Sequence, residues 1–182
     1  MTTHQANDDL KALVRTIPDF PKPGIMFRDI TTLFQNPQGF KASVERLAAP
    51  YRDAGIEAVA GIEARGFILG GAVADRLGTG FIPIRKKGKL PAKAIGEDYE
   101  LEYGVDTVEL HEDAIRPGEK ILLVDDLIAT GGTAAAAARL IEKAGGAVAG
   151  AAFIIDLPDL GGCRKLGAQG VKCHTLMEFE GD

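Results

Sequence analysis

Residues 121–138 constrain the fold of this chain more than any other segment. Four aliphatic residues, Ile121–Val124, come directly before two adjacent carboxylates, Asp125-Asp126. A short turn, Thr130-Gly131-Gly132-Thr133, then leads into five consecutive alanines, and alanine is the residue that most favours helix. The pattern predicts a buried strand, an acidic end of that strand, a tight loop and the start of a helix.

The turn and the acids before it have the chemistry of a site for a phosphorylated sugar. A helix that begins with small, hydroxyl-bearing residues exposes backbone N–H groups and a partial positive charge, which suit a phosphate. Two carboxylates suit sugar hydroxyls or a hard divalent cation. An ordinary strand-to-helix connection would explain the turn but not the two acids. A P-loop is a weaker alternative, because no lysine follows Gly132.

Strand patterns alternate with helical patterns along the chain, which is typical of a mainly parallel α/β sheet. The proline within residues 81–84 predicts an edge or terminal position for that strand. Residues 105–111 alternate apolar and polar side chains, as one side of a hairpin would. We expect strands at residues 56–62, 81–84, 105–111, 120–124, 147–155 and 171–177, and helices at residues 39–54, 66–77 and 133–143.

Length and charge limit the class of protein. The chain has 182 residues, enough to bury one substantial core, and we expect a single domain over residues 1–182. Its net charge of −5 argues against nucleic acid or a membrane surface as a partner, because both need clustered positive charge. Cys163 and Cys173 lack C-x-x-C spacing and are interpreted as reduced thiols. The polar N-terminus does not look like a signal peptide, so we expect a cytoplasmic protein.

Two segments bring positive charge to this acidic chain. Arg65 follows a predicted strand and opens a predicted helix, where it is either a surface residue or a ligand for diphosphate. Residues 85–89 hold four cations in five positions, which indicates either a solvated face or an attraction for an anionic ligand. The segment at about residues 85–104 has no steady period, and we expect a mobile loop or hairpin that excludes water from a site.

A segment near the N-terminus, residues 20–30, frames an aromatic side chain with proline and glycine. Phe27 could stack on a planar base or anchor the long N-terminal loop in the core. The backbone N–H and C=O of Arg28 could then pair with the edge of that base.

Residues 121–133 resemble the signature with which type I phosphoribosyltransferases bind 5-phosphoribosyl 1-diphosphate (PRPP): four hydrophobic residues, two acids, a few small or apolar residues and Thr-Gly-Gly-Thr. Together with residues 20–30, Arg65-Gly66-Phe67, residues 85–91 and residues 101–104, this signature makes the chain similar to the adenine phosphoribosyltransferases over about residues 17–179. The resemblance implies an α/β fold with a mainly parallel central sheet flanked by helices. It also implies a small N-terminal hood, about residues 1–35, and a flexible catalytic loop.

The resemblance implies a pentosyltransferase of purine salvage that converts adenine and PRPP to AMP and diphosphate. The implied cofactor is Mg²⁺, held through PRPP, diphosphate and water rather than directly by protein ligands. The implied assembly is a homodimer, in which Arg85 often reaches the neighbouring subunit. Two alternatives stay open: a sister enzyme that uses xanthine or hypoxanthine, and a PRPP-sensing regulator, which usually carries an additional DNA-binding domain.

The resemblance also implies a role for individual residues. Asp125 and Asp126 would hold the ribose 2′- and 3′-hydroxyls. Adenine would lie between Phe27 and Leu127, while the backbone of Arg28 reads its N6 and N1 atoms. The 5′-phosphate would bind to Ala129, Thr130, Gly131, Gly132 and Thr133, and the diphosphate to Arg65, Arg85 and Lys89. The residues implied in catalysis are Glu102, Arg65 and Arg85. Tyr99 and Tyr103 would belong to the lid.

Two finer points come with the resemblance. In this family the turn before Arg65 often contains a cis peptide bond, which here would join Glu63 and Ala64. Asp98 departs from the Ser or Thr that many relatives carry at this position, so no role is transferred to Asp98.

Overall fold

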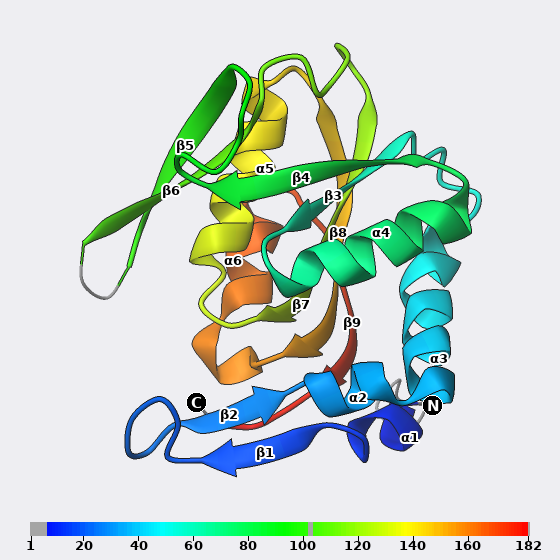
Figure 1. Ribbon diagram of the computed structural model, residues 1–182, viewed down its shortest axis with the longest axis vertical. Coiled ribbons are helices and arrows are strands. Elements are labelled where there is room, and N and C mark those ends of the chain that lie inside the picture. Colours follow the sequence, from blue (N-terminus) through cyan, green and yellow to red (C-terminus); the bar gives the residue numbers. More distant parts are fainter. Residues whose placement is uncertain (1–6, 102–103, 182) are drawn as a thin grey trace.

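The computed structural model describes residues 7–101 and 104–181. In that part of the chain, the main sheet has seven strands in the order β5-β6-β4-β3-β7-β8-β9, and the helices cover both of its faces (Figure 1). The strands are β3 (Ala58–Ile62), β4 (Gly80–Lys86), β5 (Ala94–Glu100), β6 (Val105–His111), β7 (Lys120–Ile128), β8 (Ala147–Asp156) and β9 (Cys173–Glu178).

Five strands of this sheet, β4, β3, β7, β8 and β9, pair in parallel, and β5 and β6 form an antiparallel hairpin. The hairpin predicted at residues 105–111 is therefore confirmed. The edge position predicted for residues 81–84 is wrong, since β4 lies between β3 and β6. However, β4 pairs with β6 only at Arg85 and Lys86. Pro83, which has no N–H to donate, lies where β3 is the only partner in the register of the described strands.

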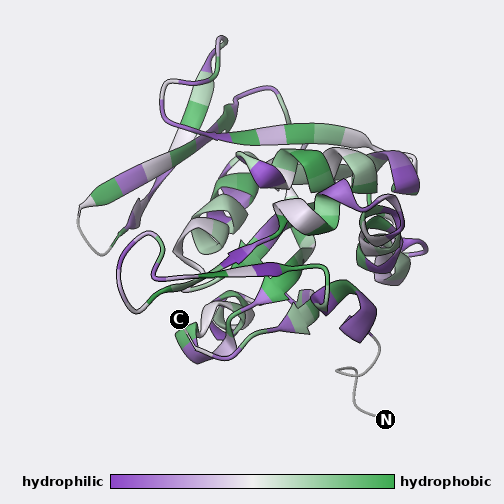
Figure 2. Ribbon diagram, turned by 60° about the horizontal axis from the view of Figure 1, so that its bottom comes forward, coloured by the Kyte–Doolittle hydropathy of each residue, from purple (hydrophilic) through white to green (hydrophobic). Residues whose placement is uncertain are grey.

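Two helices cover each face of the sheet in the described part of the chain. The side chains of β7 alternate between the two faces, so neighbouring residues of β7 belong to different hydrophobic clusters. Ile121 and Leu123 belong to the cluster under α5 (Gly132–Lys143) and α6 (Gly162–Ala168). Leu122 and Val124 belong to the cluster under α3 (Pro37–Ala48) and α4 (Arg65–Leu77). Figure 2 shows the corresponding hydrophobic colour on the strands at the centre of the molecule.

The helix predicted at residues 39–54 begins and ends earlier than expected. Asn36 caps α3, because its side chain accepts a hydrogen bond of 2.8 Å from the Gly39 N–H, and Pro37 takes the first helical position. The helix ends at Ala48 and a 3₁₀ turn, Ala49–Tyr51, follows. Pro50 accounts for this end, since proline has no N–H to continue the i→i−4 hydrogen bonds of the helix.

The N-terminal part of the chain forms a separate two-stranded ribbon beside the carboxyl ends of the parallel strands (Figure 1). Strands β1 (Arg15–Pro18) and β2 (Met26–Asp29) pair antiparallel, and the short helices α1 (Asp8–Lys11) and α2 (Thr31–Gln35) flank them. Asp29 ties the ribbon together: its carboxylate accepts hydrogen bonds from Thr31 and forms an ion pair with Arg15. These contacts, the Thr31 hydroxyl first, lower the pKa of Asp29 to about 2.

Among the helices of residues 7–101 and 104–181, none combines the length and apolar character needed to span a membrane.

Candidate active site

The loop between β7 and α5 is held in one conformation by two glycines. Gly131 has a φ of 75°, in the left-handed region that glycine enters most easily. A Cβ atom at Gly131 would lie 2.8 Å from the Cα of Gly162, and the Gly162 N–H donates to the carbonyl oxygen of Ala129 at 2.9 Å. The loop before α6 therefore touches the loop before α5, and a side chain at Gly131 would separate them.

A cavity of about 360 Å³ lies against this loop. Among the described residues it joins four parts of the chain: the end of β7 with the start of α5, the end of β3 with the start of α4, the end of β4, and β5. Arg65 contributes from α4 and Tyr99 from β5. The predicted site residues that line this cavity are Arg65, Tyr99, Asp125, Asp126, Leu127, Ala129, Thr130, Gly131, Gly132 and Thr133.

The two acids of the cavity differ in their surroundings. Asp126 is 7% exposed, and its carboxylate accepts a hydrogen bond of 2.5 Å from Arg65 Nε. Asp125 Oδ1 accepts the backbone N–H of Asp126 at 2.9 Å. Burial, followed by the negative charge of Asp126, raises the pKa of Asp125 well above its usual range. The pair therefore offers a charged acceptor beside a carboxyl group that holds its proton more tightly.

A second cavity of about 350 Å³ lies under the β1–β2 ribbon. Phe20, Phe27 and Arg28 line it, and Arg65 also does so. The rings of Phe20 and Phe27 meet edge to face with centroids 5.1 Å apart. Because Arg65 lines both cavities, the two are neighbours, but Leu127 lines only the first of them.

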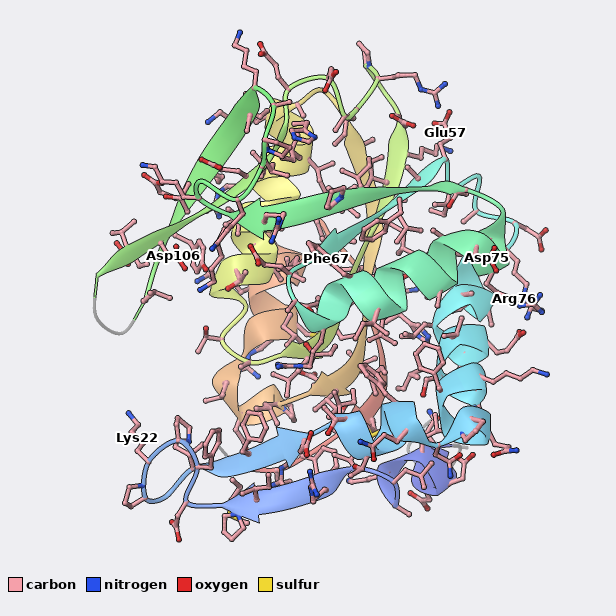
Figure 3. The ribbon with its side chains drawn as sticks, viewed as in Figure 1. Lys22, Glu57, Phe67, Asp75, Arg76 and Asp106 are labelled. Carbon is pink, nitrogen blue, oxygen red and sulfur yellow. The ribbon has the colours of Figure 1, made fainter. Side chains whose placement is uncertain are left out.

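Polar contacts hold the β5–β6 hairpin near its turn and along its side. The Tyr99 hydroxyl donates to Asp106 at 3.1 Å, and Lys86 Nζ lies 3.0 Å from the same carboxylate. Figure 3 labels Asp106 on the hairpin and Phe67 near the start of α4. From α5, Arg139 Nε donates to Glu97 at 2.8 Å. Glu102 and Tyr103, the proposed acid/base and lid residues, lie outside the described residues.

Arg85 and Lys89 are not among the described residues that line the first cavity. Arg85 Nη1 donates to the carbonyl oxygen of Lys89 at 3.1 Å, and its guanidinium carbon lies 5.9 Å from the centre of the Phe67 ring. Lys86, the next residue of β4, lines the cavity instead. Side chains of a strand alternate between its faces, and this period could have identified Lys86 from the sequence.

The turn before Arg65 has the cis peptide bond expected between Glu63 and Ala64. Glu63 also lines the cavity and accepts the backbone N–H of Lys86. Glu63 was not predicted as a site residue, since a single glutamate at the end of a strand carries no distinctive pattern.

Comparison with known proteins identifies the family. The phosphoribosyl transferase domain model matches residues 29–177. An adenine phosphoribosyltransferase of Rhizobium johnstonii is 61% identical over 173 residues, which are 95% of this chain and 96% of that protein. The chain belongs to the adenine phosphoribosyltransferases. A second family member, from Cereibacter sphaeroides, is 59% identical over 179 residues, which are 98% of this chain and 99% of the relative.

Solved structures of adenine phosphoribosyltransferases share the fold. The enzyme of Rhodothermus marinus has a TM-score of 0.90 and 51% identity, covering 96% of this chain and 99% of that one. The enzyme of Saccharomyces cerevisiae, solved with adenine and D-2,5-dideoxy-2,5-imino-altritol 1,6-bisphosphate, has a TM-score of 0.89 and 37% identity, covering 95% of this chain and 99% of that one. The expected type I phosphoribosyltransferase fold is therefore confirmed.

Proposed function

We propose that this adenine phosphoribosyltransferase binds PRPP in the cavity at the end of β7 and adenine in the cavity under the β1–β2 ribbon, and converts them to AMP and diphosphate. The observation that carries the proposal is that Arg65 lines both cavities. A nucleophile in one cavity and an electrophile in the other would meet beside a cation. In the reaction, adenine N9 forms a bond to the anomeric carbon of ribose as the bond to diphosphate breaks.

The PRPP cavity supplies complementary groups for each end of the substrate. The 5′-phosphate would lie on Ala129–Thr133, where the first turn of α5 presents backbone N–H groups and the positive end of the helix dipole. The ribose hydroxyls would lie on Asp125 and Asp126. Arg65 bonds to Asp126 in the structure, so a hydroxyl bound by Asp126 would release Arg65 towards the diphosphate.

The adenine cavity combines a ring with free main-chain groups. Phe27 would stack on one face of adenine, and Leu127, which lines the neighbouring PRPP cavity, would contact the other face. Paired residues of an antiparallel ribbon alternate between hydrogen-bonded and non-hydrogen-bonded pairs. Pro18 pairs with Met26 and cannot exchange both bonds because proline has no N–H.

We infer from this alternation that Arg28, two positions along β2, is in a non-hydrogen-bonded pair with Thr16, so its N–H and C=O point away from β1. These groups would read adenine N1 and N6. A 6-oxo purine would leave groups unpaired, at about 1–3 kcal/mol each.

Catalysis in this proposal is mostly positioning and electrostatics. Arg65, Arg85 and Lys89 would stabilise the departing diphosphate, with Arg85 acting in the neighbouring subunit of a homodimer. Glu102 would act as acid or base near adenine N7. The hairpin that carries Tyr99 and Tyr103 would close over the site and keep water from hydrolysing PRPP.

The residues of the site fit Mg²⁺ as the cofactor. The described residues contain no group of three or more His, Cys, Asp or Glu side chains arranged for a metal. Asp125 and Asp126 nevertheless put two carboxyl groups in the PRPP cavity, where they would orient the ribose hydroxyls and water around a Mg²⁺ ion that is itself held by PRPP and diphosphate. Bound with PRPP, Mg²⁺ would neutralise charge on the diphosphate leaving group. The protein would work in the cytoplasm, without nucleic acid or membrane as a partner.

A competition assay tests this function directly. The protein is incubated with PRPP, Mg²⁺ and equal amounts of adenine, hypoxanthine and xanthine, and the nucleotides formed are identified. We expect AMP with the wild-type protein. We expect none with Asp126→Ala, whose circular dichroism spectrum should match that of the wild type. Formation of IMP or XMP as the main product would establish a sister enzyme, and a fully active Asp126→Ala variant would refute the sugar-binding role.

A further inference from the structure

Phe179, directly after β9, has two cations close to its ring. The Arg28 guanidinium carbon lies 4.5 Å from the centre of the Phe179 ring, and Lys11 Nζ lies 4.7 Å from it. Both distances fall within the roughly 6 Å at which a cation and an aromatic face attract. The Phe179 N–H donates to the carbonyl oxygen of Asp156 at 3.1 Å, so the backbone that carries this ring is fixed to the end of β8.

The side chain of Arg28 contacts β1 and residues 179–180, which we call the C-terminal segment. Its Nη1 donates to Thr16 Oγ1 at 2.7 Å and its Nη2 to the carbonyl oxygen of Glu180 at 3.3 Å. In the described part of the chain, Arg28 Nε is buried without a hydrogen-bond partner. A guanidinium that is partly removed from water interacts more strongly with an aromatic face than an exposed one.

These contacts connect the C-terminal segment to the adenine cavity. Arg28 also lines the cavity where Phe27 lies, and consecutive residues of a strand direct their side chains to opposite faces. Anchoring the Arg28 side chain on the C-terminal segment therefore fixes how far the ribbon stands from the sheet. It also fixes the direction in which the main-chain groups of Arg28 point.

We propose that Phe179 is a positioning residue for the base: its ring holds the Arg28 guanidinium, and through it sets the main-chain groups that recognise adenine. This inference rests on the proposed role of Arg28 in reading adenine. Phe179 itself does not touch the substrate. Its removal should affect adenine and purine selectivity while leaving PRPP binding almost unchanged.

The test compares three substitutions at one position. We expect Phe179→Ala and Phe179→Leu to raise KM for adenine by about tenfold, within the range of a partly desolvated cation–π contact. The preference in kcat/KM for adenine over hypoxanthine should fall by a similar factor, and KM for PRPP should stay within about twofold of the wild type. Phe179→Tyr keeps the aromatic face and should restore the wild-type values. Leucine keeps most of the apolar bulk, so it separates the ring face from packing.

A double-mutant cycle shows whether Phe179 acts through Arg28. Arg28→Met removes the guanidinium but leaves the main chain, so Phe179→Leu should add almost nothing to its effect on KM for adenine. A matched control is Phe40→Leu, which removes the ring pair of Phe34 and Phe40. It should lower Tm without changing KM for adenine.

Additive effects in the cycle, an unchanged KM for adenine in Phe179→Ala, or an equal rise in KM for PRPP would each overturn the inference. Phe27→Ala distinguishes that result from failure of the proposed base site. If Phe27→Ala raises KM for adenine and the Phe179 variants do not, the role of Phe179 is refuted and the proposed function stands. If Phe27→Ala has no effect, the proposed base site and this inference both fail.

Discussion

At the scale of single residues, Asp125 and Asp126 show how neighbours in sequence acquire different chemistry. Asp126 forms an ion pair with Arg65. Burial and the negative charge of Asp126 instead raise the pKa of Asp125. A carboxyl whose pKa is raised by folding binds its proton more tightly in the folded chain, so its ionisation destabilises the fold. This destabilisation is absent below the unfolded pKa of about 3.9 and complete above the raised folded pKa.

Replacing Asp125 with an uncharged residue should therefore raise the stability of the fold and lower the transferase activity. Asp125→Asn keeps an Oδ1 acceptor for the Asp126 N–H but carries no charge. We expect a higher Tm at about pH 8, by roughly 2–4 °C for each kcal/mol gained, and a loss of transferase activity. At about pH 5 the gain should shrink, because the wild-type carboxyl is then closer to its protonated form. An equal gain in Tm at both pH values would contradict the raised pKa.

At the scale of elements, the contact between the loop before α5 and the start of α6 leaves no room for a side chain at Gly131. Gly131→Ala would place a methyl group 2.8 Å from the Gly162 backbone, and alanine is disfavoured at positive φ by about 1–2 kcal/mol. We expect a lower Tm and a rise in KM for PRPP of at least about tenfold, since displacing the loop misplaces its N–H groups.

Gly170→Ala is the matched control for this prediction. Gly170 has a φ of 80°, but apart from its chain neighbours no atom of residues 7–101 and 104–181 lies within 4 Å of the position a Cβ would take. It should show the same backbone effect on Tm with an unchanged KM for PRPP. Similar KM values in the two variants would show that the contact with Gly162 does not shape the phosphate site.

The hairpin is a second element whose position can be tested, because side chains of α5 hold one side of it. Arg139 holds β5 through Glu97 and through the carbonyl oxygen of Asp98. Exposed ion pairs of this kind contribute about 0.2–1 kcal/mol. We expect Arg139→Met to speed hydrogen exchange of β5 amides by about two- to fivefold, an effect that 1 M salt should mimic in the wild type by screening. Arg52→Met, which removes an ion pair with Glu45, should leave β5 unchanged.

At the scale of the whole molecule, the proposed homodimer can be tested by mixing two inactive variants. Arg85→Ala and Asp126→Ala are each expected to be inactive alone. If Arg85 acts in the neighbouring subunit, a mixed dimer has one site with both defects and one site with neither. After subunit exchange, about a quarter of wild-type activity should return. No recovery, with exchange verified by sedimentation of tagged chains, would place Arg85 in the site of its own subunit.

Local patterns in the sequence predicted the central elements well. β7 and α5 could be predicted because a buried aliphatic run, two acids and an alanine-rich helix are contiguous. Strands β1 and β2 were missed because each is four residues long, too short for a period to emerge. The contact between Arg28 and Phe179 joins segments far apart in the chain, and only the assembled fold brings them together. The roles of Glu102 and Tyr103 stay predictions.

The five alanines of α5 have a thermodynamic consequence for ligand binding. All of Ala134–Ala138 are buried, directly behind the turn proposed to hold the 5′-phosphate. A methyl group has no rotamers, so this support has no side-chain entropy left to lose when an anion is immobilised in front of it. Affinity for the phosphate should therefore come with little ordering of the helix, and its calorimetric entropy should chiefly reflect released water and the substrate itself.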